Sequence, residues 1–262
     1  MLPITYFTPT DSWVNSPGYV DGTADFARPI TARCLECHST YFQSADATNR
    51  NENRFVQDNF VLGIGCVRCH GPATDHIAFH RENPSAAEAR HIVHPGNLST
   101  AESIAICAQC HSGIGIPRQP SFTYLPGRQL SEYLELNTGP EAHQAGVHTA
   151  NQYARLKLSK CFQRSDSMTC ATCHDPHAHE HGDEKRFARR CLTCHQAENC
   201  PSVSRAQPEL VDRCVTCHMR EEAFADITVV AEGQRSTPRM HDHRIRVWQE
   251  HSRDLLQQWD IR

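Results

Sequence analysis

The sequence repeats one short arrangement of thiols and an imidazole that is suited to holding a prosthetic group. Six copies of Cys-x-x-Cys-His occur, and they use twelve of the fourteen cysteines. Two thiols three residues apart lie on one side of a helical turn, where both can add to the vinyl groups of one porphyrin, and the next imidazole faces the iron. The pattern therefore predicts six covalently bound c-type haems. The predicted attachment cysteines are Cys34, Cys37, Cys66, Cys69, Cys107, Cys110, Cys170, Cys173, Cys191, Cys194, Cys214 and Cys217, and the predicted proximal iron ligands are His38, His70, His111, His174, His195 and His218.

Two other uses of paired cysteines fit the pattern less well. Paired Cys-x-x-Cys units build tetrahedral zinc sites, but such sites do not need a histidine directly after every pair. A disulfide framework would also leave the six histidines unexplained, and it is unusual in a chain of 262 residues.

Twelve further histidines are available as sixth, distal ligands of the irons, twice the number that six haems require. Because a lone surface histidine is usually solvated, at least half of them are expected to have no ligand role. Local context, such as a turn directly after a motif or an i, i+2 spacing on an extended segment, selects the candidates. The predicted distal ligands are His76, His94, His148, His177, His241 and His243.

The composition indicates that side chains alone build only a thin core. Hydrophobic residues make up 39% of the chain, and the mean hydropathy is −0.57. The porphyrin faces are therefore predicted to supply much of the buried apolar surface as a haem stack. The formal charge of −4 becomes about −10 when six ferric haems with their propionates are added, which favours basic partners or cations.

Several classes of protein are excluded by what the sequence lacks. No stretch approaches the ~20 apolar residues of a membrane-spanning helix, and neither a basic run nor a phosphate-binding loop suggests nucleic acid. The first ten residues have no signal-peptide pattern, so an export signal is predicted to be absent from this chain. Since covalent haem attachment takes place outside the cytoplasm, a periplasmic or extracellular location is expected.

The predicted fold is mainly α with much irregular loop, a haem-stack core and little strand. Glycines and prolines between 112 and 138 predict a loop, residues 141–161 a helix, and the spacing from Ile245 to Trp259 an amphipathic helix. One hexahaem module is expected over residues 1–262. Its predicted parts are an extended arm (1–33), haems one to three (34–111), a loop and helix connector (112–169), haems four to six (170–218), and a C-terminal tail and helix (219–262).

Cys161 and Cys200 lie outside every motif. In an oxidising compartment two spare thiols most simply form a disulfide, here closing a loop around haems four and five. Two free buried thiols, or one thiolate ligand to an iron, are the alternatives.

Several phrases of the sequence are similar to those of one family. They are Arg28-Pro29-Ile30 before the first motif, Gly65-Cys66-Val-Arg-Cys69-His70-Gly71-Pro72, Ser159-Lys160-Cys161-Phe162, Thr169-Cys170-Ala-Thr-Cys173-His174-Asp175-Pro176-His177, and Asp242-His243-Arg244-Ile245. Over nearly its full length the chain resembles multihaem cytochromes c related to the tetrahaem cytochrome of ammonia oxidisers, in particular the exported forms of planctomycete-like bacteria. The resemblance implies a helical, loop-rich fold with closely packed haems. It also implies distal ligands at His76, His148, His177 and His243.

Three functions follow from these features. In the first, every iron has two histidine ligands and is low-spin, so the protein only transfers electrons to redox partners, other multihaem cytochromes among them. In the second, one five-coordinate haem makes the chain an oxidoreductase for nitrogen or sulfur compounds; no histidine occurs in residues 1–33, which makes haem one the candidate. In the third, a version of the first, the arm and the 112–138 loop join the chain into an oligomer, a filament or a larger multihaem complex.

Overall fold

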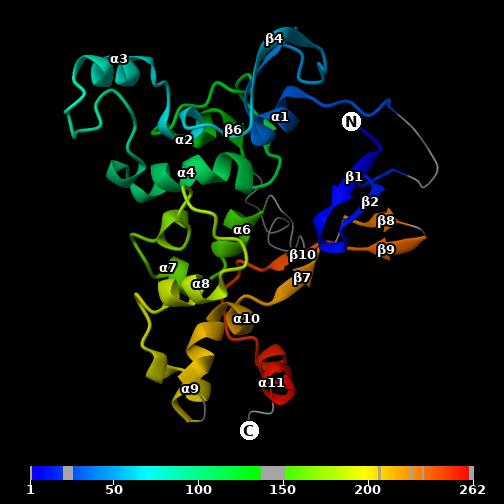
Figure 1. Cartoon of the computed structure of the whole chain (residues 1–262), viewed down its shortest axis with the longest axis vertical. Helices are drawn as coiled ribbons and strands as arrows, with labels where there is room; N and C mark the ends of the chain where they lie inside the picture. Colours follow the sequence, from blue (N-terminus) through cyan, green and yellow to red (C-terminus); the bar gives the residue numbers. More distant parts are fainter. Residues whose placement is uncertain are drawn as a thin grey trace. The chain divides into compact units, whose positions relative to one another are not determined.

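The computed structural model describes residues 2–19, 26–136, 151–205, 208–224, 227–231 and 233–259. The chain divides into two compact units, whose elements are labelled in Figure 1. Unit 1 comprises Met1–Asn137 and Val229–Arg235, and unit 2 comprises Thr138–Thr228 and Ser236–Arg262. The first three Cys-x-x-Cys-His motifs therefore belong to unit 1, and the last three belong to unit 2.

Unit 1 consists of short helices, turns and two-stranded sheets joined by loops. Its helices and 3-10 turns are η1 (Thr8–Thr10), α1 (Ala32–His38), α2 (Val67–His70), α3 (Thr74–Glu82), η2 (Pro95–Asn97), α4 (Thr100–His111) and η3 (Leu130–Glu132). Its strands form the pairs β1 (Ile4–Phe7) with β2 (Ser12–Asn15), β3 (Ser39–Ser44) with β4 (Phe55–Leu62), β5 (Ile116–Pro117) with β6 (Leu134–Glu135), and β8 (Val229–Ala231) with β9 (Gln234–Ser236).

The β3–β4 hairpin fixes the direction of the first motif, because α1 runs directly into β3. The two strands are antiparallel with Phe42 opposite Phe60, and these rings stack with centroids 5.1 Å apart. Ser39, at the junction, is 2% exposed, and its hydroxyl donates to the Leu35 carbonyl at 2.6 Å. The turn that carries Cys34 and Cys37 is thereby tied to the sheet.

Helix α4 is the main source of buried apolar side chains in unit 1, and the third motif ends it. It begins with a capping box, in which the Ser99 hydroxyl accepts the Glu102 N–H and the Glu102 carboxylate accepts the Ser99 N–H. This exchange satisfies two of the N–H groups that a helix start leaves without partners. The helix buries Ile104, Ala105, Ile106, Ala108 and Gln109.

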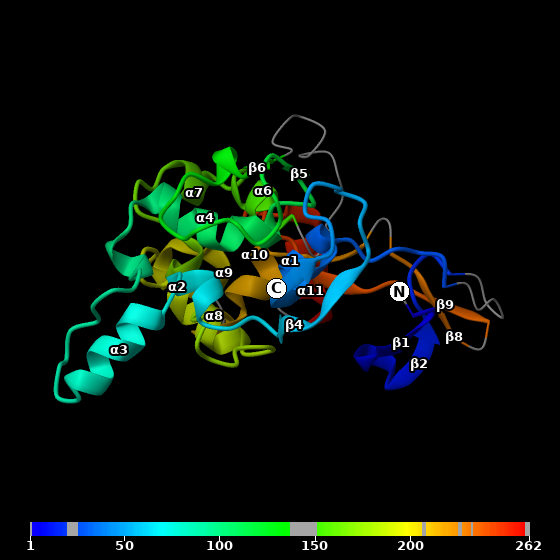
Figure 2. The ribbon, with the colours of Figure 1, turned by 90° about the horizontal axis from the view of Figure 1, so that it is seen from above.

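Between α2 and η2 the chain makes an excursion from the rest of unit 1. Figure 2 shows α3 projecting at the end of this excursion, and no residue of α3 is buried. The excursion carries His76 and His80, so it presents imidazoles on an element that has little packing of its own.

Unit 2 is built from shorter helices and turns and one two-stranded sheet. Its elements are α6 (Gln152–Leu156), α7 (Lys160–Gln163), η4 (Cys170–Thr172), α8 (Glu184–Cys191), η5 (Ala197–Asn199), α9 (Pro201–Arg205), η6 (Pro208–Arg213), α10 (Cys214–His218), β7 (Glu221–Ala223), β10 (Arg239–His241) and α11 (Gln249–Gln258). Strands β7 and β10 pair antiparallel, with Met240 opposite Glu222. Helices α8 and α10 pack together with η6, and α11 packs on α10.

The observed elements differ in detail from those expected. Within residues 1–33 an antiparallel hairpin forms over β1 and β2, and its turn places Asp11 in the left-handed region (φ 51°). The C-terminal helix begins at Gln249 rather than near Ile245, and the Ile245 and Arg246 N–H groups before it donate to Ser159 Oγ and to the His218 carbonyl. Every strand that the structure describes belongs to a two-stranded sheet. Helix α6 lies in the region 141–161 that the sequence predicts as helical, α7 begins at the end of that region and runs to Gln163, and 137–150 are outside the described residues.

Across the part of the chain that the structure describes, no helix is both long enough and apolar enough to cross a bilayer.

Replacing Ser99 with alanine should destabilise unit 1, because the capping box at the start of α4 is lost. A lost cap of this kind costs about 1 kcal/mol of unfolding free energy. A lower denaturant midpoint for Ser99→Ala in urea unfolding followed by circular dichroism is the expected result. The variant Glu102→Gln keeps a side chain that can complete the box, so an equal loss in both variants would contradict this role of Ser99.

Candidate functional site

All six Cys-x-x-Cys-His motifs lie on single helical turns. The first is contained in α1, the third ends α4, and the sixth forms α10. In the second, fourth and fifth motifs the histidine N–H donates to the carbonyl of the first cysteine, the i to i+4 bond of a helical turn. These three bonds are His70 to Cys66 (2.9 Å), His174 to Cys170 (2.9 Å) and His195 to Cys191 (3.0 Å). Each turn brings two thiols and one imidazole together, as haem attachment requires.

The motifs open onto the surfaces of their units and are not enclosed. None of the twelve motif cysteines or six motif histidines is buried in the protein alone. Large apolar side chains stand exposed next to the motifs, among them Leu62 (71%) and Ile64 (55%) before the second motif and Ile114 (75%) after the third. A flat apolar group attached to these turns would cover such surface, so the residues present fit haem.

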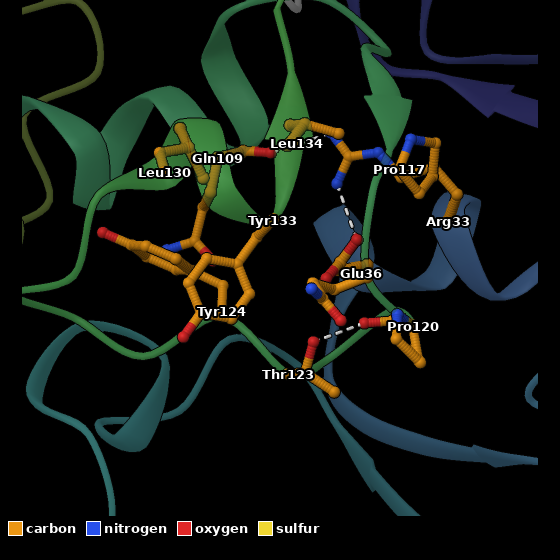
Figure 3. Close-up of a pocket in the computed structure, with 11 residues that line it drawn as sticks. Arg33, Glu36, Gln109, Pro117, Pro120, Thr123, Tyr124, Leu130, Tyr133 and Leu134 are labelled. Carbon is orange, nitrogen blue, oxygen red and sulfur yellow. Dashed lines mark hydrogen bonds and ion pairs between the residues drawn. The ribbon is translucent and has the colours of Figure 1, made fainter.

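The residues between the cysteines of the first three motifs meet in one buried polar cluster, part of which is drawn in Figure 3. Glu36, Arg68 and Gln109 occupy the same position in the three motifs, and all are less than 10% exposed. Arg68 Nη2 donates to the Gln109 side-chain oxygen at 2.7 Å and to the Glu36 carbonyl at 3.0 Å. The turns of the first three motifs are therefore held together by the side chains that the motif leaves variable.

Arg33, directly before Cys34, completes this cluster. Its guanidinium donates to the Glu36 carboxylate at 2.7 Å, to the Gln109 carbonyl at 2.9 Å and to the Ile114 carbonyl at 2.7 Å. The other Glu36 oxygen accepts the Phe122 N–H at 2.7 Å. A buried charge needs this degree of pairing, because each unpaired partner would bear the full cost of leaving water. The adjoining cavity, lined also by Tyr124 and Leu134, measures about 10 Å³ and has room for no more than one water molecule.

Thiols from different motifs of unit 1 lie side by side. The Cys37 and Cys110 thiols share a hydrogen bond, which lowers the pKa of Cys37 to about 7 and raises the pKa of Cys110. Burial, followed by the charge of Cys107, raises the pKa of Cys69. The cysteines of the third motif therefore lie next to cysteines of both the first and the second motif.

Unit 2 repeats this arrangement. The Cys191 and Cys214 thiols of the fifth and sixth motifs share a hydrogen bond, which lowers the pKa of Cys214 to about 7 and raises the pKa of Cys191. Burial raises the pKa of Cys173 in the fourth motif, and the charges of Cys161 and Cys194 raise it further. Each motif of unit 2 therefore has a cysteine next to another motif.

The disulfide predicted between Cys161 and Cys200 is not present, since both cysteines are free. They lie beside different motifs: Cys161 neighbours Cys173, whereas Cys200 neighbours Cys217 and adds to the burial that raises the pKa of that thiol to about 11. Among the described residues, no group of three or more His, Cys, Asp or Glu side chains is arranged to hold a metal ion by itself.

Two of the motif histidines are oriented by backbone carbonyls. His70 Nδ1 lies 2.8 Å from the Val93 carbonyl, and His218 Nδ1 lies 3.1 Å from the Arg246 carbonyl. This contact turns the Nε2 edge of each ring to the opposite side, the arrangement in which histidines bind metals. Trp248 also contacts His218, because its indole N–H donates to the His218 carbonyl at 3.1 Å.

Three of the predicted distal ligands have the same orientation. His76 Nδ1 lies 2.7 Å from the Arg90 carbonyl, His241 Nδ1 lies 2.6 Å from the Met219 carbonyl, and His243 Nδ1 lies 3.1 Å from the His241 carbonyl. The ring of His243 is also nearly parallel to that of His174, with an angle of 22° and centroids 6.2 Å apart.

The other three predicted distal ligands are His94, His177 and His148. His94 is the N-cap of η2. The His177 side chain is 77% exposed with Nδ1 3.9 Å from Asp175. His148 lies outside the described residues.

Sequence reasoning missed two kinds of residue. His80 is not among the predicted distal ligands, but its Nε2 is buried without a hydrogen-bond partner in the described residues, and its ring lies 4.6 Å from that of His76. The second kind is the polar residue before the second cysteine in each of the first three motifs. Nothing in the sequence indicates that Glu36, Arg68 and Gln109 contact one another.

Comparison with known proteins gives one relative. The sequence is 25% identical over 193 residues to the C-type polyheme cytochrome OmcC of Geobacter sulfurreducens. The alignment covers 65% of this chain and 22% of that protein, so the chain spans about a fifth of the relative's length. No family model and no solved structure matches the chain. The similarity supports a multihaem c-type cytochrome in general, with haem c as its cofactor.

Replacing Glu36 with alanine should destabilise unit 1 strongly, because Arg33 would stay buried without that carboxylate and the Phe122 N–H would lose its acceptor. Breaking a buried ion pair costs about 3–5 kcal/mol of unfolding free energy. The exposed pair of Arg90 with Glu88 provides the matched control, since Glu88→Ala should cost at most about 1 kcal/mol. Chemical denaturation of both variants measures the difference, and equal losses would contradict the role of the cluster.

Proposed function

We propose that this protein transfers electrons through six c-type haems, each bound by one Cys-x-x-Cys-His motif and each six-coordinate with two histidine ligands. The observation that carries the proposal is that all six motifs lie on single helical turns with thiols and imidazole accessible to one flat group. When bound, haem supplies a one-electron redox couple whose potential depends on axial ligands, burial and hydrogen bonds.

The chain's own residues hold these groups close together and in fixed orientations. Neighbouring motifs have cysteines in contact, Cys37 with Cys110 and Cys191 with Cys214, so the porphyrin edges attached to them would be near neighbours. Backbone carbonyls at Nδ1 orient His70, His76 and His241. Because His76 and His241 are distal candidates that are oriented like the proximal candidate His70, they support two-histidine ligation and therefore electron transfer rather than catalysis at iron.

The wider setting belongs to the same proposal. Covalent haem attachment, together with the resemblance of the sequence phrases to cytochromes of the ammonia-oxidiser type, favours a periplasmic or extracellular protein. One hexahaem module whose core is largely porphyrin would carry a charge of about −10. Its redox partner is therefore expected to present a basic surface, and an assembly with further multihaem cytochromes is a natural use of such a module.

The haem number is tested by mass. The intact protein, produced in a host that attaches haem c, should carry six haems, and a Cys170→Ala/Cys173→Ala variant should carry five. The control Cys161→Ala/Cys200→Ala removes two cysteines outside the motifs and should retain six. A count below six in the native chain, or a loss of haem in the control, would contradict the assignment.

The coordination is tested by electron paramagnetic resonance of the fully oxidised protein. If every iron has two histidine ligands, the spectrum should contain low-spin signals that integrate to six irons and should not change when nitrite or hydroxylamine is added. A stoichiometric high-spin signal that responds to either compound would overturn the electron-transfer proposal and indicate an oxidoreductase with one open iron.

A further inference from the structure

The segment His241 to His243 is held in place by a buried ion pair. Asp242, between the two histidines, is 0% exposed. Arg155 of α6 binds it through two contacts, Nε to Oδ1 at 2.8 Å and Nη2 to Oδ2 at 2.5 Å. Burial would raise the pKa of Asp242, but the hydrogen bonds from Arg155 and from the Arg244 N–H outweigh it and lower the pKa, so the carboxylate remains charged.

A second buried contact fixes the main chain of His243. Ser159 is 0% exposed; its hydroxyl donates to the His243 carbonyl at 3.0 Å and accepts the Ile245 N–H at 2.8 Å. The segment from α6 to Ser159 therefore forms hydrogen bonds with the chain on both sides of the His243 side chain. Buried ion pairs contribute little net stability, and their best-attested use is to specify one arrangement.

The ion pair also fixes the main chain between the two histidines. Strand β10 ends at His241 and a bend follows at His243, and Asp242, between them, is held by Arg155. Each histidine turns its Nδ1 edge toward a backbone carbonyl, of Met219 and of His241 respectively.

His174 of the fourth motif stands opposite His243. Its Nδ1 lies 3.8 Å from the Glu180 carboxylate, which is buried and paired with Arg186. The rings of His174 and His243 are 6.2 Å apart between centroids and 22° from parallel. Two imidazoles bound through Nε2 on opposite sides of one metal ion, with bonds of about 2.0 Å, have ring centroids roughly 6.3 Å apart.

We infer that His243 is the sixth ligand of the haem attached at Cys170 and Cys173, opposite His174, and that Arg155 with Asp242 is the device that positions it. The inference rests on the proposed function, since it needs a haem at the fourth motif. It pairs two ligands that are 69 positions apart in the sequence and assigns a role to an ion pair that touches no iron.

The ligand role is tested in the full haem-loaded chain with His243→Ala. One of six haems should change from low to high spin in electron paramagnetic resonance, with the haem count unchanged at six, and added imidazole should restore the low-spin signal. His243→Met should instead keep that haem low-spin and raise its midpoint potential. His251→Ala is the matched control in the same segment, since His251 Nε2 is hydrogen-bonded to the Thr216 carbonyl, and all six haems should stay low-spin.

The pairing is tested by the double variant His174→Met/His243→Ala. If both histidines serve one iron, the double variant alters or loses one haem, as His174→Met does alone. Two altered haems would show that the histidines serve different irons and would overturn the pairing. Six haems that all remain low-spin in His243→Ala would overturn the ligand role while leaving the proposed function intact, whereas a native chain without six haems would overturn the proposed function itself.

The positioning role is tested with Asp242→Asn, which keeps the shape of the side chain and removes its charge. The signal of the haem at Cys170 and Cys173 should broaden or shift, and its midpoint potential should change, while the three haems of unit 1 stay as in the native protein. Asp212→Asn, which alters an exposed pair with Lys185 in the same unit, should leave the haem at Cys170 and Cys173 unchanged. A loss of stability in Asp242→Asn without a change at that haem would overturn the positioning role.

Discussion

Covalent attachment of a flat group to a single helical turn requires that one side of the turn be left open. Two thiols and an imidazole must face the same direction, so the polypeptide cannot pack its own apolar side chains there. This requirement explains why the motif residues of both units stand at the surface and why large apolar side chains such as Leu62 and Ile114 remain exposed beside them. It also explains why polar contacts, rather than a large apolar core, align the turns.

The two units meet this requirement with different polar contacts. In unit 1 the contacts come from inside the motifs, through the cluster of Arg33, Glu36, Arg68 and Gln109. In unit 2 they come from the C-terminal segment, which lies outside the motifs. Its backbone carbonyls and the buried Asp242 orient histidines. The first arrangement fixes three turns relative to one another. In the second, one segment of the chain orients several imidazoles.

Local features were predictable from the sequence, and contacts between distant residues were not. The helical turns follow from the i, i+3 and i+4 spacing of each motif. Backbone carbonyls orient His76, His241 and His243, and their role as distal ligands stays a prediction. The cluster in unit 1 joins positions 32 and 41 residues apart, and no periodic pattern links them. The disulfide between Cys161 and Cys200 was inferred from their number alone, but each of these cysteines packs beside a different motif. The haem-stack core remains a prediction.

The contacts between thiols of different motifs have a consequence for how the protein matures. Before haem is attached, Cys37 lies against Cys110 and Cys191 against Cys214, and in each pair one thiol has a pKa near 7. A thiolate beside a thiol is readily oxidised to a disulfide in an oxidising compartment, and such a bond would join two motifs and block both from porphyrin. Thioether formation and disulfide formation therefore compete for the same sulfurs. If the six motifs bind haem as proposed, the close spacing of these thiols would make the chain dependent on reductant until its haems are attached.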